Sequence, residues 1–204
     1  MTEQNNFCTF IAARHGQTEW NIVGRIQGHL DSPLTPAGEK QANDLAEELK
    51  EIQIDAIFSS DLLRAKRTAE IISIPHQLVV TTTESLRERK LGQLEGTQEN
   101  ELATLRELRV KNDPDAFTLR GIETEEEIVS RLTTFLRETA IAYSGKAVLL
   151  ITHGSALRAL LVHMGYGSHD DLNSATIANL AYIKFSSDGK NFVINEVKGI
   201  DRNE

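Results

Sequence analysis

Two histidines in this chain each precede a glycine and each follow a short apolar run. His15 lies in the triplet Arg-His-Gly after the run 7–13, and His153 lies in Thr-His-Gly after the run 147–151. Apolar runs of this length between helical patterns are typical of buried strands in an α/β sheet. Ligands of open α/β sheets bind at the carboxyl ends of the strands, so the two histidines are expected to meet over one site.

The residues around these histidines suit a phosphate group. Arg14 is adjacent to His15, and Arg64 is expected one turn into the helix that follows the second strand. A guanidinium is always charged and pairs with phosphate oxygens in a bidentate fashion, and a helix N-terminus favours anions. The glycine after each histidine is expected to let the backbone approach a ligand closely. This pattern indicates phosphoryl transfer.

Each histidine has an expected role in that chemistry. His15 can act as a nucleophile if one ring nitrogen faces phosphorus while the other is held by a hydrogen bond. The product would be a phosphohistidine, which water hydrolyses in a second step. For His153, the expected role is to donate a hydrogen bond or a positive charge to an equatorial phosphate oxygen.

The leaving oxygen also needs a proton, which a carboxylic acid usually supplies. The charged stretch 84–96 contains the candidates Glu84, Glu88 and Glu95. Charge runs of this kind are usually solvated surfaces, so position alone selects none of the three.

The expected elements form a single domain over residues 1–204. Strands are predicted at 7–13, 55–59, 77–82 and 147–151, with a hairpin formed by 177–185 and 192–197. Helices are predicted from Thr35-Pro36 onward and at 61–72, 98–111, 123–143 and 155–164, and 14–35 is predicted to be a long loop. Residues 84–122 are interpreted as a lid-like excursion over the top of the sheet.

The composition limits the class of protein. The chain has 204 residues, 40% of them hydrophobic, and a net charge of −8, which disfavours nucleic acid and anionic membrane surfaces as partners. There is no apolar run of membrane-spanning length, and the first residues lack the pattern of a signal peptide, so a cytoplasmic location is expected. The lone Cys8 is expected to be a buried, inert thiol.

At this point the sequence resembles the histidine phosphatase superfamily, also called phosphoglycerate mutase-like. The octapeptide 14–21, Arg-His-Gly-Gln-Thr-Glu-Trp-Asn, is highly specific for that family. Weaker matches follow in the family's order and cover most of the chain: 27–28, 31–35, 59–61, 64–65, 86–88, 95–96 and 152–154. One departure is 120–124, where Arg-Gly-Ile-Glu-Thr replaces the commoner Pro-Gly-Gly-Glu-Ser.

The resemblance implies a three-layer α/β/α sandwich with a mostly parallel central sheet and no cofactor or metal. It implies His15 as the phosphorylated nucleophile, with Arg14, Arg64 and His153 completing the phosphate pocket, and Glu88 as the proton donor. The residues expected on the substrate side are Asn21, Gln27, Gly28, Gly154 and Ser155. The expected partner is a small-molecule phosphate ester, and the oligomeric state is open.

Within this family, the sequence favours a phosphatase over a mutase. Mutases similar to this chain carry a longer insertion after the acid and an Asn after the second His-Gly, where this chain has Ser155. The insertion is short in this chain, so its pocket is expected to be more open and to admit water to the phosphohistidine. The nearest alternative is a phosphoglycerate mutase that depends on 2,3-bisphosphoglycerate.

Two alternatives belong to other classes of protein. A phosphate-binding module without turnover is disfavoured because the full catalytic set is present. A metallohydrolase could use His163, His169, Asp170 and Asp171, but their spacing matches no ligand pattern.

Overall fold

The computed structural model describes residues 7–98, 100, 114–168, 171–172 and 177–201. Its strands form one six-stranded sheet with the order β3-β2-β4-β1-β5-β6. The strands are β1 Cys8–Arg14, β2 Ala56–Ser60, β3 Val80–Thr83, β4 Ala147–Thr152, β5 Ile177–Ser187 and β6 Phe192–Ile200. Strands β3, β2, β4 and β1 run parallel, whereas β5 pairs antiparallel with both β1 and β6. The sheet is therefore mostly parallel, as predicted.

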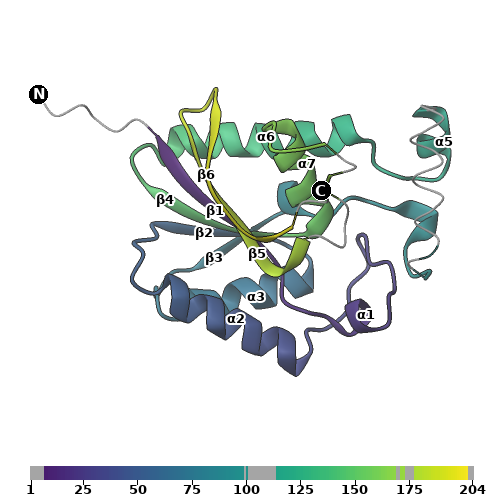
Figure 1. Cartoon of the computed structure of the whole chain (residues 1–204), viewed down its shortest axis with the longest axis horizontal. Coiled ribbons are helices and arrows are strands. Elements are labelled where there is room, and N and C mark those ends of the chain that lie inside the picture. The colour runs from purple at the N-terminus through teal and green to yellow at the C-terminus, as the bar shows by residue number, and fades with distance from the viewer. Residues whose placement is uncertain (1–6, 99, 101–113, 169–170, 173–176, 202–204) are drawn as a thin grey trace, which may run out of the picture.

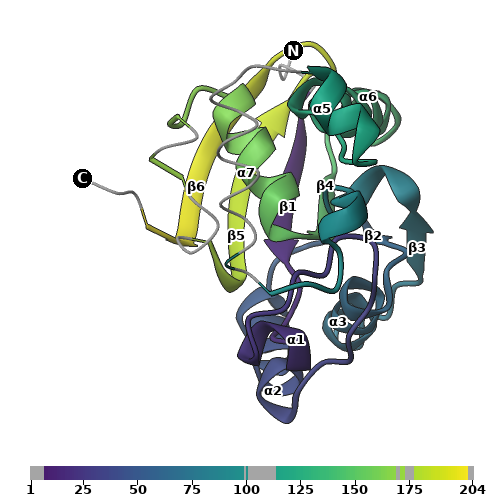
Figure 2. The ribbon, with the colours of Figure 1, turned by 90° about the vertical axis from the view of Figure 1, so that its right-hand side faces the viewer.

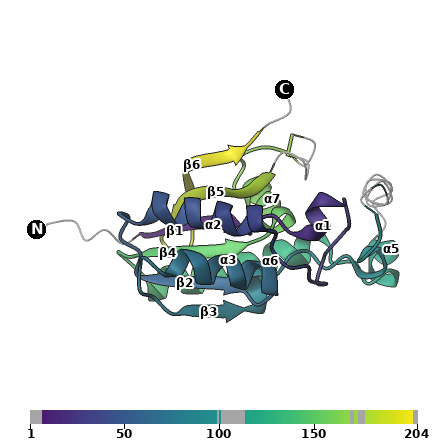
Figure 3. The ribbon, with the colours of Figure 1, turned by 90° about the horizontal axis from the view of Figure 1, so that it is seen from below.

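Helices cover both faces of this sheet. The α-helices are α1 Glu19–Ile22, α2 Pro36–Leu49, α3 Leu63–Ser73, α5 Pro114–Leu119, α6 Glu125–Ala142 and α7 Gly154–His163, and the 3-10 helices are η1 Glu84–Leu86 and η2 Gly92–Leu94. Figures 1 and 3 show α2 and α3 on one face and α6 and α7 on the other. The short helices α1 and α5 lie at one end of the sheet, which faces the viewer in Figure 2.

Side chains of β1 alternate between two hydrophobic cores, as expected for a strand covered on both faces. Cys8, Phe10 and Ala12 belong to the core shared with α6 and α7. Ile11 and Ala13 belong to the core shared with α2 and α3. The three-layer α/β/α arrangement is confirmed, and Cys8 is buried as predicted, which raises the pKa of its thiol to about 12.

A third, smaller core lies under the stretch predicted to be a lid. It consists of Ile26, Leu91, Leu94, Phe117 and Ile122. These residues join the first long loop to the stretch that follows β3. The predicted helix 98–111 lies almost entirely outside the described residues.

Most predicted elements are present, and three differ for identifiable reasons. Helix α2 has Thr35 as its N-cap and Pro36 at its start, as predicted. The predicted loop 14–35 contains α1, because Thr18 and Asn21 form a capping box. Strand β3 begins at Val80 rather than 77, since Gln77 has a φ of 55° and turns the chain.

Helix α3 also begins later than predicted, at Leu63 rather than 61. Asp61, the first residue of the predicted helix, is bound to Arg87 instead. The last strands and α6 and α7 lie within three residues of their predicted bounds. Among the described residues, none of the helices is long and apolar enough to span a bilayer.

Candidate active site

The two histidines follow neighbouring strands in register. Strand β1 pairs with β4 in parallel, with Arg14 opposite Thr152. The backbone N–H of His15 donates to the carbonyl of Thr152 at 3.0 Å. The chain therefore leaves both strands at the same level, and His15 and His153 lie side by side, as predicted. Their ring centroids are 5.2 Å apart, at an interplanar angle of 61°.

The His15 ring is held in one orientation by its own loop. Its Nδ1 lies 2.8 Å from the carbonyl oxygen of Gly16. A carbonyl oxygen only accepts hydrogen bonds, so the neutral ring carries its proton on Nδ1, which leaves the lone pair on Nε2. This is the arrangement that a histidine nucleophile requires.

The His153 ring has a different environment. It is fully buried, and neither ring nitrogen has a hydrogen-bond partner among the described residues. A buried polar group without a partner costs about 1–3 kcal/mol, and such groups are rare in native proteins. This imidazole is therefore positioned to hydrogen-bond a ligand.

Both imidazoles are neutral in the folded protein. Burial, followed by the positive charges of Arg64 and Arg14, lowers the pKa of His15 well below its ordinary value. Burial, followed by the charges of Arg64 and of His15, lowers the pKa of His153 in the same direction. The charge of Arg64 therefore favours the neutral form of both rings.

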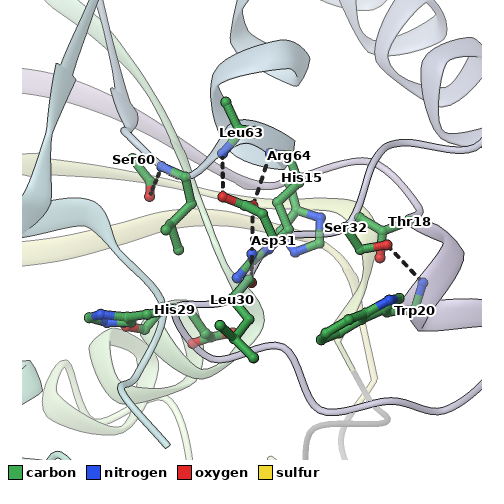
Figure 4. Close-up of polar contacts among 12 residues, drawn as sticks. His15, Thr18, Trp20, His29, Leu30, Asp31, Ser32, Ser60, Leu63 and Arg64 are labelled. Carbon is green, nitrogen blue, oxygen red and sulfur yellow. Dashed lines mark hydrogen bonds and ion pairs between the residues drawn. The ribbon is translucent and has the colours of Figure 1, made fainter. Parts of the chain in front are cut away.

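Arg64 extends from the first turn of α3 and is 1% exposed (Figure 4). Its Nη1 donates to the carbonyl of Leu30 at 2.8 Å and to Asp31 Oδ1 at 3.0 Å, and its Nη2 donates to the carbonyl of Gly28 at 2.8 Å. Its Nε has no partner among the described residues. The donors that remain, on Nε and Nη2, share one edge of the guanidinium, and such an edge suits two oxygens of one phosphate.

Asp31 holds both Arg64 and the start of α3. Its Oδ2 accepts from the backbone N–H of Leu63 at 3.0 Å, in addition to the Arg64 contact (Figure 4). Leu62, the N-cap residue, makes no side-chain hydrogen bond. Asp31 therefore satisfies the N-terminus of this helix from a loop more than 30 residues away in sequence.

Arg14 and the two glycines show that the His-Gly corners are not equivalent. Nη1 of Arg14 donates to the carbonyl of Ile177. A Cβ on Gly154 would lie 3.6 Å from Arg14 Nε, so this glycine borders the arginine. A Cβ on Gly16 would lie only 2.6 Å from the carbonyl oxygen of Gly38. At Gly16 a side chain is therefore excluded by the backbone at α2. Close approach of a ligand to this glycine stays a prediction.

Of the three candidate acids, only Glu88 contacts the second histidine corner. Its Oε2 accepts from the backbone N–H of Ser155 at 3.3 Å, and its Oε1 accepts from the backbone N–H of Arg89 at 2.8 Å. Glu84 is 77% exposed and pairs with Arg87. Glu95 accepts from the backbone N–H groups of His29 and Leu91 and therefore braces a loop.

The residues predicted on the substrate side have varied surroundings. Asn21 uses its side-chain oxygen to accept from Thr18, and Gly28 has a φ of 52° with no room for a Cβ, which would lie 2.4 Å from Glu95 Oε1. Gln27 is buried, with Oε1 unpartnered among the described residues. Ser155 meets Glu88 through its backbone.

Sequence reasoning missed three residues at this site: Asp31, Asn179 and His29. The Asn179 side chain donates to the carbonyl of His15 at 3.0 Å, and His29 Nε2 lies 2.9 Å from the carbonyl of Glu88. Both residues were assigned to a strand or a loop without a role. The β5–β6 register is irregular around Asn179, as is common beside active sites, but this irregularity is visible only in the structure.

The metallohydrolase alternative gains no support from the described residues. Among them, no group of three or more His, Cys, Asp or Glu side chains gathers at one point. The ring of His163 packs against Phe192, and Asp171 accepts from Ser168. His169 and Asp170 lie outside the described residues.

The chain belongs to the histidine phosphatase superfamily. The model for branch 1 of that superfamily matches residues 10–198, which includes both histidine corners and Glu88.

Individual relatives carry phosphatase and mutase names. The chain is 37% identical over 177 residues to the uncharacterized phosphatase PhoE of Bacillus subtilis, covering 86% of this chain and 87% of PhoE. It is 30% identical over 204 residues to a broad-specificity phosphatase of Saccharomyces cerevisiae, covering 96% and 87%. The solved phosphoglycerate mutase of Bacillus anthracis superposes with a TM-score of 0.76 at 25% identity, covering 97% and 95%. An Arabidopsis thaliana relative is named phosphoglycerate mutase-like.

Proposed function

We propose that this protein hydrolyses small phosphate monoesters through a phosphohistidine on His15. The observation that carries the proposal is the buried His153 ring, which has two unpartnered nitrogens and lies 5.2 Å, between ring centroids, from an imidazole oriented by Gly16. An anion with several acceptor oxygens satisfies His153 and the open edge of Arg64 together. The relatives named as phosphatases support phosphatase activity.

In the first step, the Nε2 lone pair of His15 attacks phosphorus. The N–P bond forms as the P–O bond to the leaving group breaks, and the carboxylic acid of Glu88 gives its proton to the leaving oxygen. Arg14, Arg64 and His153 stabilise the three equatorial oxygens. In the second step, Glu88 takes a proton from water, whose oxygen attacks phosphorus and releases the histidine as inorganic phosphate forms.

The neutral state of His15 suits this mechanism. Because burial and the two arginines lower its pKa, the lone pair is available at neutral pH. The dianion brings the negative charge that Arg14 and Arg64 face, and metal ions are not required in such a scheme.

The test is capture of the phosphoenzyme. Wild-type protein mixed with a ³²P-labelled monoester should carry an acid-labile, alkali-stable label and release inorganic phosphate. Glu88→Gln should lower kcat/KM, which reports on the first step, by about 10²–10⁴-fold for esters with poor leaving groups and much less for activated esters. The matched control is His163→Ala, an exposed histidine at the end of α7, which should keep label and turnover. Phosphate release without any labelled protein would reject the proposal.

The second candidate is a 2,3-bisphosphoglycerate-dependent mutase, which the mutase names among the relatives favour. It differs in the acceptor of the phosphoryl group, a second hydroxyl rather than water. Efficient isomerisation of phosphoglycerate with negligible phosphate release would establish the mutase, whereas release from p-nitrophenyl phosphate and sugar phosphates supports the phosphatase.

A further inference from the structure

We propose that Arg131 and Glu123 form a clamp that positions Glu88, and so control the protonation step without touching the substrate. The inference rests on the proposed role of Glu88 as the general acid. Arg131 lies in α6, and Glu123 lies just before the start of that helix. The name Arg131–Glu123 clamp is used for this pair.

The two side chains meet in a bidentate ion pair. Nε and Nη2 of Arg131 donate to the two carboxylate oxygens of Glu123 at 2.6 and 2.9 Å. This uses one edge of the guanidinium and fixes its plane. The remaining donors face the backbone before the acid: Nη1 donates to the carbonyl of Ser85 at 2.8 Å, and Nη2 donates to that of Glu88 at 3.1 Å.

Glu123 holds the backbone after the acid. Its carboxylate accepts from the N–H of Lys90 at 3.2 Å, and its own N–H donates to the carbonyl of Lys90 at 2.9 Å. Its carbonyl accepts from Arg89 Nε at 2.7 Å. The clamp therefore holds the chain on both sides of Glu88.

The segment needs such support because it has no regular structure of its own. Residues 87–91 lie between η1 and η2 and belong to no helix or strand. Their backbone groups must find partners elsewhere, and the clamp and His29 supply several of them. Carboxylate placement at the site therefore depends on side chains that lie outside it.

The clamp also borders a cavity that the two histidines do not line. Arg131, Glu123 and His29 line a cavity of about 630 Å³. Among the described residues, its lining includes neither His15 nor His153. The hydrogen bonds of Arg131 go to Glu123, Ser85 and Glu88, which is the basis for a role through Glu88. Its positive charge also contributes to lowering the pKa of His153.

The experiment compares Arg131→Gln with Arg137→Gln, the same change at an exposed arginine of the same helix. We measure kcat/KM for a simple alkyl phosphate, which has a poor leaving group, and for p-nitrophenyl phosphate. Arg131→Gln should lower the alkyl value by about 10²-fold, the cost of a misplacement of about 1 Å, and leave the p-nitrophenyl value nearly unchanged. Arg137→Gln should change neither.

A double-mutant cycle with Glu88→Gln separates positioning from general weakening. Once Glu88 has lost its acid function, Arg131→Gln should cause no further loss on the alkyl ester. An additive loss in that background, or equal losses on both esters, would overturn the inference. If Arg131→Gln does not fold, Arg131→Lys and Glu123→Gln each keep part of the clamp and are held to the same criterion.

The outcomes also separate this inference from the proposed function. If the phosphoenzyme forms and Glu88→Gln shows the expected leaving-group dependence, but Arg131→Gln shows none, only the clamp is wrong. If the wild type forms no phosphoenzyme, or Glu88→Gln acts equally on both esters, the proposed function and the clamp are both wrong.

Discussion

The two histidine corners lie at the same level of adjacent strands, yet the two rings differ in their hydrogen bonds. At His15 the Nδ1 proton is bound by Gly16, and the backbone carbonyl accepts from Asn179. At His153 neither ring nitrogen is bound by a described residue. Two histidines at equivalent positions in the fold therefore differ in whether a hydrogen bond fixes the orientation of the ring.

The difference indicates a division of labour. A nucleophile must present one lone pair along one line, so its orientation is best fixed before the substrate arrives. A donor to a phosphate oxygen can leave its hydrogen-bonding groups open until the ligand fills them, at a cost in stability. Four predictions examine this contrast, from the largest expected effect to the smallest.

Replacing the nucleophile should have the largest effect. His15→Ala should eliminate the phosphoenzyme and lower kcat by about 10⁴-fold or more, since the covalent route is lost. Single-turnover labelling with a ³²P-monoester measures both. Residual labelling at another histidine would show that the two corners had been assigned the wrong way round.

Replacing His153, whose ring nitrogens have no partner among the described residues, should lower activity and raise stability. His153→Leu should lower kcat by about 10²–10³-fold, the value of one preorganised donor. Because it removes unpartnered buried nitrogens worth about 1–3 kcal/mol, it should also raise the thermal midpoint, by roughly 2–4 °C per kcal/mol for a chain of this size. His15→Leu, at a ring that has a partner, serves as the control and should give no such gain.

Removing the hydrogen bond from Asn179 to the His15 carbonyl should lower kcat less than replacing either histidine ring. Asn179→Ala removes the donor to the His15 carbonyl and should lower kcat by about tenfold, below the loss of about 10²-fold that a misplacement near 1 Å produces. Asn195→Ala, at an exposed site on β6, is the matched control. Unchanged turnover in Asn179→Ala would show that Gly16 alone orients the nucleophile.

Acidification should destabilise the folded protein through both rings. Their folded pKa values lie well below 6.5, whereas in the unfolded chain they titrate near 6.5. As the pH falls below about 6.5, the unfolded chain binds more protons, so the free energy of unfolding decreases by up to about 1.4 kcal/mol per pH unit for each histidine. Thermal midpoints at pH 7 and pH 5 should therefore differ more in the wild type than in His153→Leu. Equal differences would place His153 in an exposed or charged state.

Much of this architecture could be predicted from local patterns. Apolar runs marked the strands that end at His15 and His153, and Thr35-Pro36 marked the start of α2. Prediction failed where a side chain with a local role in the expected structure binds a residue distant in sequence instead. The predicted helix 61–72 begins at Asp61, but the carboxylate of Asp61 pairs with Arg87, and the carboxylate that reaches the start of α3 is that of Asp31. Sequence spacing carries no information on which of two similar carboxylates reaches a helix.

The candidate site was likewise only partly predictable. The arginines and histidines could be grouped because each follows a strand or begins a helix at one edge of the sheet. Glu88 was selected over Glu84 and Glu95 by family resemblance and not by its position in the charged stretch. In the structure, Glu88 alone of the three accepts a hydrogen bond from Ser155, a contact between residues 67 positions apart.

The sequence by itself determined which side chains leave the strand ends, because strand periodicity and helix starts are local properties of the chain. Tertiary structure decided which side chains are already satisfied and which remain open. The Arg64–Asp31, His15–Asn179 and Arg131–Glu88 contacts join residues 33, 164 and 43 positions apart. Such contacts depend on how the layers pack. They distinguish His15, whose ring is already oriented, from His153, whose ring nitrogens have no partner among the described residues.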